Sequence, residues 1–345
     1  MINKKIRDYG INIGDFRTGN NNSITDVKGV KVGHRTLDDG VIKTGVTAIL
    51  PHEGNIFKDK LIAACHVING FGKSTGLIQI DELGTIETPI ILTNTLSVGT
   101  AHEALVRYML SQNDDIGNTT GTVNPIICEC NDGVINDIRG MHIKSQHIYE
   151  AIERCDVEFA EGNVGAGTGM VCYDLKGGIG SSSRIVELGN TEYIVGVLVL
   201  SNFGSLKDFV LNGDHLGERL FEKIEDTNIT EDKGSIISIL ATDIPLSSRQ
   251  LKRIVKRIYP GISRTGSYTG NGSGEVVIGF STANIIKHYE EEDIVDIRVI
   301  NEDKINKIFK ATVEATEEAI LNSLICSTST IARDGKQVHS LKDFL

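Results

Sequence analysis

The chain has 345 residues, about two-fifths of them apolar, and a formal net charge of −11. A chain of this length can bury a large core, and the negative charge argues against non-specific binding to nucleic acid or to an anionic membrane. We therefore expect a small-molecule or peptide partner, and neither a nucleic-acid nor a membrane partner.

The first residues, "MINKKIRDYGINIGDFRTGNNNS", contain no apolar segment of signal-peptide length, and no later apolar run is long enough to span a bilayer. The six cysteines are scattered, none at zinc-site spacing, and four lie in apolar segments. We expect a cytoplasmic protein with reduced cysteines, and neither a metal nor another cofactor.

The predicted elements are short β-rich runs punctuated by glycine, with a few amphipathic helices between them. In chain order they are strands within 45–51, 60–70 and 89–96, a helix at 97–112, strands within 122–137, 193–204 and 235–246, a helix at 247–261, a strand at 275–284 and a helix at 303–325. The order lacks the regular alternation of a doubly wound fold, which favours layered sheets covered by helices in one domain. Exposed loops are expected at 20–23 and 221–234.

The segment "YIVGVLVLSNFGSLKDFVLNG", residues 193–213, has two apolar runs separated by Gly204 and Ser205. Gly-Ser pairs are common turn signals, so the pattern alone indicates two strands joined by a turn.

Three motif-like segments fail as nucleotide or zinc sites. A phosphate loop has a glycine five residues before the Gly-Lys pair; in "GFGKSTG" (70–76) that pair begins at Gly72, and the required position is Val67. The segment "GNVGAGTGM" (162–170) ends on Met170, where a dinucleotide motif needs glycine. "HEALV" at 102–106 lacks the second histidine of a zinc protease. ATPase, dehydrogenase and metalloprotease functions are therefore disfavoured.

Several longer motifs occur together in a characteristic order. They are "ITDVKGVKVGH", "ING", "LTNTLSVGTAHEAL", "NDGVINDIRG", "EGNVGAGTGM", "VLVLSNFGSL", "ATDIPL", "RTGSYTGNGSGEVVIGFSTAN" and "VEATEEAILNSL". Through them the chain resembles, nearly end to end, the DmpA-like family of L-aminopeptidase D-amidase/D-esterases and β-peptidyl aminopeptidases. The resemblance implies an α+β, four-layer αββα sandwich of the Ntn-hydrolase-like type and an assembly of several αβ units.

The resemblance also implies self-cleavage between Gly204 and Ser205, which would divide the single domain 1–345 into an α subunit (1–204) and a β subunit (205–345). A serine hydroxyl needs a base to become a good nucleophile, and cleavage would give Ser205 an α-amine with an unperturbed pKa of about 7.7–8.0. Glycine fits the preceding position because it has no Cβ to block its carbonyl.

Other site residues follow from the resemblance, each with a plainer alternative. Asn163 matches an oxyanion-hole asparagine, or is simply a turn residue. Glu129 matches an acid that meets the substrate ammonium group, or lies on a solvent-exposed strand face. Asp243 is expected to support the nucleophile, although Ala241 replaces a serine expected nearby, or it caps the next helix.

Further residues are expected to line the substrate pocket, with turns or caps as the alternative. They are Asn94 and the loop residues Asn271, Gly272 and Ser273, followed by Glu275 where many relatives have Asp. The family's active-site tyrosine has no clear counterpart; its position falls near Val134.

We expect a self-cleaving serine aminopeptidase that removes N-terminal residues from small peptides, amides or esters, including those of D- or β-amino acids. One alternative is an autoprocessed amidohydrolase or acyltransferase of the pantetheine-amide or ornithine-acetyl type, although such relatives use threonine as the nucleophile. The other is an uncleaved, non-catalytic family member.

Overall fold

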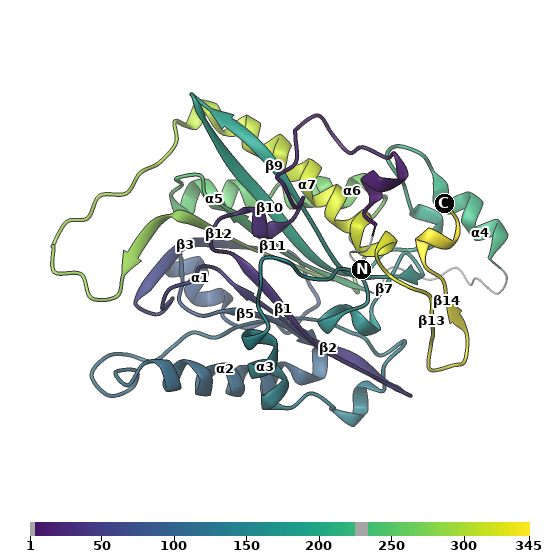
Figure 1. Ribbon diagram of the computed structural model, residues 1–345, viewed down its shortest axis with the longest axis horizontal. Helices are drawn as coiled ribbons and strands as arrows, with labels where there is room; N and C mark the ends of the chain where they lie inside the picture. Colours follow the sequence, from purple (N-terminus) through teal and green to yellow (C-terminus); the bar gives the residue numbers. More distant parts are fainter. Residues whose placement is uncertain (1–3, 225–233) are drawn as a thin grey trace.

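The computed structural model describes residues 4–224 and 234–345, which form four stacked layers (Figure 1). Two β-sheets face one another, and helices cover the outer face of each sheet. This is the αββα order of layers that the family resemblance implies. No helix within the described ranges is both long and apolar enough to cross a bilayer.

The smaller sheet has four strands and carries two helices on its outer face. Across the sheet the strands are β1 (Lys31–Asp39), β2 (Ile42–Leu50), β5 (Ile90–Asn94) and β6 (Ile126–Cys130). The helices are α2 (Val98–Gln112) and α3 (Ser145–Glu153). β5 and β6 are parallel, and α2 lies between them in the chain as a crossover helix.

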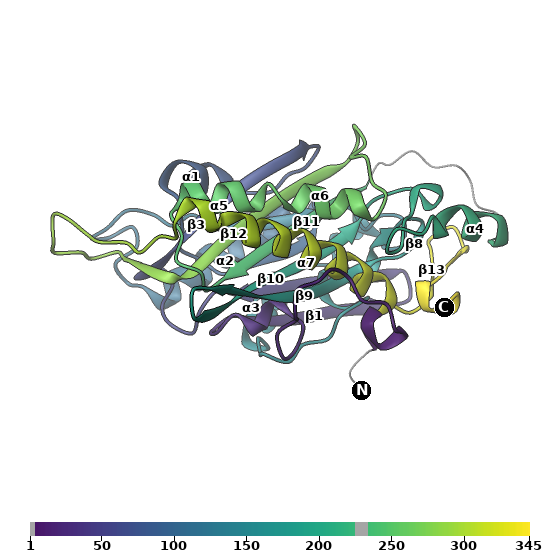
Figure 2. The same cartoon turned by 90° about the horizontal axis from the view of Figure 1, so that it is seen from above.

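The larger sheet has six strands. Across the sheet they are β4 (Thr85–Ile86), β3 (Asp59–Gly70), β12 (Gly274–Lys287), β11 (Ser235–Thr242), β10 (Thr191–Asn202) and β9 (Gly178–Leu188). Its covering helices are α5 (Ser248–Val255), α6 (Ile258–Arg264) and α7 (Ile305–Ile325), and Figure 2 shows them side by side over the strands. The remaining elements are α1 (Leu77–Leu83), α4 (Leu216–Lys223), β7 (Val171–Cys172), β8 (Leu175–Lys176), β13 (Thr330–Ile331) and β14 (Gln337–Val338).

The apolar runs of the central strands are continuous because both faces of the larger sheet are buried. In β10, Leu198 and Leu200 face the smaller sheet, whereas Val197 and Val199 pack in the cluster beneath the helices. Such two-sided burial removes the alternation of a half-exposed strand.

The predicted strands and helices are present, with a break in one helix. The segment 247–261 forms two helices, α5 and the start of α6, which meet at Lys256 and Arg257. Pro260 explains the break, because its ring would clash with the carbonyl of Lys256 and it has no N–H to donate there.

The loop expectations are partly wrong. In the segment 20–23, Asn22 and Ser23 are buried, and Asn22 hydrogen-bonds Glu318 of α7 and Ser182 of β9. These bonds replace contacts with water. Most of the predicted loop 221–234 lies outside the described residues.

Candidate active site

Ser205 lies beyond the end of β10, where the chain enters a short 3-10 helix. β10 ends at Asn202, and the 3-10 helix spans Leu206–Asp208 with Ser205 at its N-cap position. Ser205 is only 7% exposed. The expectation of a second strand after Ser205 is therefore wrong, and the Gly-Ser pair is not an exposed hairpin turn.

Gly204 occupies a position that disfavours any other residue for two reasons. Its φ of +85° lies in the left-handed region. In addition, a Cβ on Gly204 would lie 2.5 Å from Cδ1 of Tyr173. The Tyr173 ring is fully buried, and its hydroxyl hydrogen-bonds Thr265 Oγ1 at 2.7 Å, so the ring has little room to move.

Glu129, on β6, is a buried carboxylate with neutral partners. It is 4% exposed; its Oε1 accepts a hydrogen bond from the backbone N–H of Lys73 at 2.9 Å, and its Oε2 accepts one from the hydroxyl of Thr95. No Lys, Arg or His side chain in residues 4–224 or 234–345 forms an ion pair with it. A carboxylate can accept about four hydrogen bonds, so capacity remains for a cationic group.

A chain of contacts connects Glu129 to the C-terminal end of β10, the strand that precedes Ser205. Its Oε1 lies close to Gly72, and a Cβ on Gly72 would be 4.0 Å from the Cα of Gly274. Gly274 pairs with Ser235 of β11, which in turn pairs with Asn202 of β10. The side chain of Asn202 donates to the carbonyl of Asn131 at 3.1 Å, just after β6. The two sheets therefore bring both residues to one end of the molecule.

The loop before β12 lies at the same end and is organised by Asn69. The side-chain amide of Asn69 donates to the carbonyls of Asn271, Ser273 and Gly270. Ser273 is fully buried and donates its hydroxyl to Glu275 Oε1 at 3.1 Å. Of the predicted pocket residues in this loop, Asn271 is exposed and Gly272 is half-buried.

Asn163 lies beside the start of β9. The backbone of its neighbour Gly162 pairs with Ile179, and Gly178 pairs with Ser201 near the end of β10. The amide oxygen of Asn163 accepts from the backbone N–H of Thr328 at 3.1 Å. This bond directs the Nδ2 donor, the group an oxyanion hole requires, away from Thr328.

Asn94 serves as a cap rather than as an exposed pocket residue. It is 2% exposed, its Oδ1 accepts from the N–H of Ser97, and its Nδ2 donates to Thr44 Oγ1 at 2.9 Å. The amide oxygen caps the turn before α2, and the amide nitrogen binds the end of β5 to β2. The capping alternative therefore describes this residue.

The expectation that Asp243 supports Ser205 is wrong in this structure. β10 and β11 are antiparallel, with Asn202 opposite Ser235 and Val195 opposite Thr242. Asp243 therefore lies about 25 Å along the sheet from the level of Asn202, at about 3.3 Å per residue. Its carboxylate accepts from the N–H of Ile194 at 2.7 Å and holds the opposite end of the strand pair.

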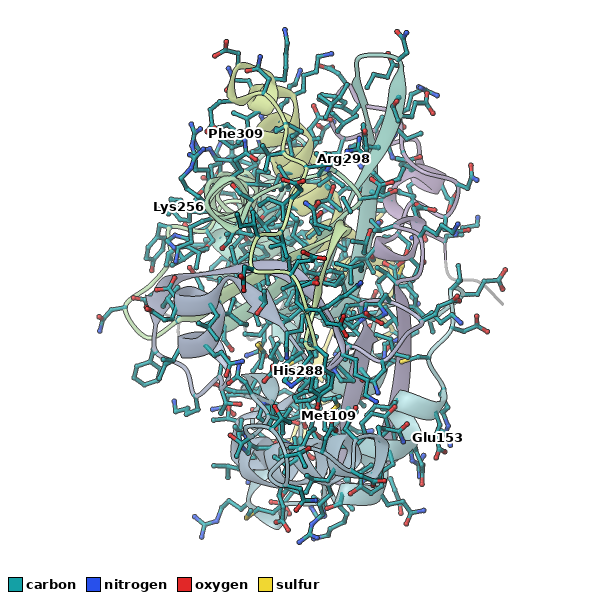
Figure 3. All side chains as sticks on the ribbon, turned by 90° about the vertical axis from the view of Figure 1, so that its left-hand side faces the viewer. Met109, Glu153, Lys256, His288, Arg298 and Phe309 are labelled. Carbon is teal, nitrogen blue, oxygen red and sulfur yellow. The ribbon has the colours of Figure 1, made fainter. Side chains whose placement is uncertain are left out.

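Figure 3 views the molecule from this opposite end. Phe309 and Lys256 mark the helical layer over the larger sheet, and Met109 and Glu153 mark the helices over the smaller sheet. His288, just after β12, lies between them. The elements around Ser205 lie at the other end, together with β7 and α4 (Figure 1).

Two buried ionisable residues near the Ser205 end of the molecule were not predicted from the sequence. Lys176 is fully buried, its ammonium group donates to the carbonyls of Gly167, Met170 and Gly177, and burial lowers its pKa to about 7. Asp132 is also fully buried, accepts from Asn136 Nδ2 at 3.0 Å, and has its pKa raised by burial to about 6. Nothing in the local sequence marks either residue as buried.

No group of three or more His, Cys, Asp or Glu side chains in the described parts of the chain could hold a metal ion. The six cysteines, all in those parts, form no disulfide.

Comparison with known proteins identifies the family. The model of peptidase family S58 matches residues 22–338. The chain belongs to peptidase family S58.

Similar proteins match this chain over most of their own length. The β-peptidyl aminopeptidase BapA of Sphingosinicella microcystinivorans is 35% identical over 359 aligned residues, covering 98% of this chain and 89% of that protein. The crystal structure of the PH0078 protein from Pyrococcus horikoshii OT3 is 53% identical, with a TM-score of 0.94 over 98% of this chain and 96% of that one.

A second similar structure is named for its activity. The L-aminopeptidase D-Ala-esterase/amidase from Ochrobactrum anthropi, described as a prototype of the serine aminopeptidases and a variant of the Ntn-hydrolase fold, is 33% identical. Its TM-score is 0.89, and the match covers 98% of this chain and 95% of that one. The fold and enzyme class predicted from the sequence are confirmed: this S58 chain is a serine aminopeptidase with an Ntn-hydrolase fold.

Proposed function

We propose that this S58 peptidase cleaves its own Gly204–Ser205 bond and then uses Ser205 as an N-terminal nucleophile. In the first reaction, Ser205 Oγ attacks the Gly204 carbonyl carbon, the C–N bond breaks, and the hydroxyl proton is transferred to the departing amine. Water then hydrolyses the ester, which frees the carboxylate of Gly204 and restores the hydroxyl. The new α-amine of Ser205 has a pKa suited to general-base catalysis near neutral pH.

The observation that carries this proposal is that a buried serine and a buried carboxylate, which has no cationic partner among the described residues, lie at one end of the two sheets. Ser205 supplies the nucleophile, and Glu129 binds the ammonium group of a substrate whose first carbonyl carbon is attacked. A buried carboxylate is costly without a cation beside it, and the ammonium group of a substrate would supply that cation. The site should therefore favour substrates with a free amine. The Nδ2 of Asn163 donates to the oxyanion that develops during attack.

The substrates we propose are short peptides, amides and esters with a free N-terminal amine. BapA is named as a β-peptidyl aminopeptidase, and the Ochrobactrum enzyme is named as an L-aminopeptidase and as an esterase and amidase for D-alanine substrates. We extend both classes to this chain. The exposed Asn271 and its neighbour Gly272 line the side-chain pocket.

We also propose that the mature enzyme is a cytoplasmic oligomer of cleaved αβ units. The absence of disulfides among the six cysteines suits a reducing compartment. Size-exclusion chromatography with light scattering would test the assembly, and a monomeric mass would contradict it.

The test of the proposed activity is a panel of p-nitroanilides of L-, D- and β-amino acids with and without an N-acetyl group. Wild-type enzyme should release p-nitroaniline only from substrates with a free amine, and Ser205→Ala should release none. Ser111→Ala, at an exposed position on α2, is the matched control and should keep full activity. Turnover by Ser205→Ala, or equal turnover of acetylated substrates, would contradict the proposal.

A further inference from the structure

The β7–β8 hairpin next to the proposed scissile bond has an unusual turn. Tyr173 and Asp174 form its two-residue turn, with φ values of +52° and +55°. A turn with two residues in the left-handed region usually contains Gly or Asn, although Asp is tolerated there better than Tyr. Such backbone outliers persist where the surrounding structure holds them and often occur at functional sites.

This hairpin contacts the chain on both sides of the proposed cleavage point. The backbone N–H of Tyr173 donates to the carbonyl of Phe203 at 2.7 Å, and the Tyr173 ring packs against Gly204. On the other side, Asp174 Oδ2 accepts a hydrogen bond from the backbone N–H of Leu206 at 2.9 Å. Residues before, at and after the bond are thus held by one turn.

We infer that Asp174 is a positioning residue that fixes Ser205 through the N–H of Leu206, both before and after cleavage. The inference rests on the proposed cleavage at Gly204–Ser205. Cleavage makes Ser205 a chain terminus, and termini lose order unless something holds them. A hydrogen bond to a carboxylate is stronger than one to a neutral acceptor and can hold the residue next to the nucleophile.

Two substitutions separate the side chain of Asp174 from the backbone strain of the turn. Asp174→Gly removes the carboxylate and accepts the left-handed conformation, whereas alanine would add strain of its own. Asp174→Asn keeps an acceptor oxygen but removes the charge, and asparagine also tolerates this conformation.

Asn212→Gly is the matched control. Asn212 is exposed, has a φ of +50°, and lies with Gly213 in a two-residue turn bounded by Leu211 and Asp214. This substitution makes the same kind of backbone change away from the Asp174–Leu206 contact.

The experiment measures the rate of self-cleavage of freshly refolded full-length chain, then kcat and KM of the cleaved enzyme, with melting temperature as a check on folding. Asp174→Gly should slow cleavage and lower kcat about 10- to 100-fold with KM nearly unchanged, as expected for loss of a hydrogen bond to a charged group. Asp174→Asn should be slowed about 3- to 10-fold. Asn212→Gly should match wild type.

The outcomes distinguish this inference from the proposed function. If wild-type chain does not cleave, the proposed function fails. If wild type cleaves and both Asp174 variants match it in cleavage rate and kcat, the positioning role of Asp174 is overturned. If Asp174→Gly does not fold, the comparison of Asp174→Asn with wild type decides, and equal rates again overturn the inference.

Discussion

Replacing Gly204 with alanine should destabilise the chain by about 2–5 kcal/mol. The left-handed conformation, at φ +85°, costs an L-residue about 1–2 kcal/mol. The new methyl group would also lie 2.5 Å from Cδ1 of Tyr173, and forcing an additional carbon into a packed site costs about 1–3 kcal/mol more. The bond of Tyr173 to Thr265 limits the relief that ring movement can supply.

The assay is equilibrium urea unfolding in a Ser205→Ala background, so that cleavage does not complicate the comparison. Gly335→Ala is the control, because Gly335 has the same φ of +85° and nothing lies within 4 Å of the position that its new Cβ would take. The control should lose only the conformational cost of about 1–2 kcal/mol. Equal losses at Gly204 and Gly335 would refute the argument that Tyr173 packs against the scissile segment.

Three further predictions concern neighbouring groups. Tyr173→Phe removes the hydroxyl that bonds Thr265 but keeps the ring against Gly204, so urea unfolding should show a loss of about 1 kcal/mol while self-cleavage continues. Glu129→Gln should lower kcat/KM for substrates with a free amine about 10- to 100-fold and leave self-cleavage unchanged, because it removes the charge that meets the ammonium group. Asp132, whose pKa burial raises to about 6, binds its proton more tightly in the folded chain than in the unfolded one, so stability should fall by up to about 3 kcal/mol as pH rises from about 4 to about 6.

Each of these predictions has a contradicting result. Loss of cleavage in Tyr173→Phe would mean that the hydroxyl, and not the ring, matters at the junction. An unchanged kcat/KM in Glu129→Gln would remove this residue from substrate binding. Asp132→Asn should show no such fall between pH 4 and 6, and a profile parallel to wild type would locate the titrating group elsewhere.

Much of the fold could be predicted from local patterns. The strand runs within 193–204 and 235–246 are apolar because both faces of β10 and β11 are buried, and the helical period of 303–325 appears as α7. The location of Ser205 at a strand end also follows from the apolar run that precedes it. These features depend on the pattern of apolar residues within a short segment, and a single sequence shows that pattern directly.

The rest depends on contacts between distant segments. Asp243 and Glu129 both belong to strand segments, and the sequence pattern alone does not show which end of a sheet each occupies. The antiparallel register of β10 and β11 shows that Asp243 lies at the end of the larger sheet far from Ser205. The Tyr173–Asp174 turn contains no glycine, so the sequence does not indicate a left-handed conformation there. Tertiary contacts with Phe203 and Leu206 hold the turn in that conformation.

The central claim, that this peptidase cleaves itself before Ser205, is tested most directly by the intact mass of the purified protein. The account predicts two chains, residues 1–204 and 205–345, the second beginning at Ser205, with a C-terminal hydroxamate on the first when hydroxylamine intercepts the ester. Ser205→Ala should remain whole. A wild-type chain that stays at 37.5 kDa after prolonged incubation would contradict the account.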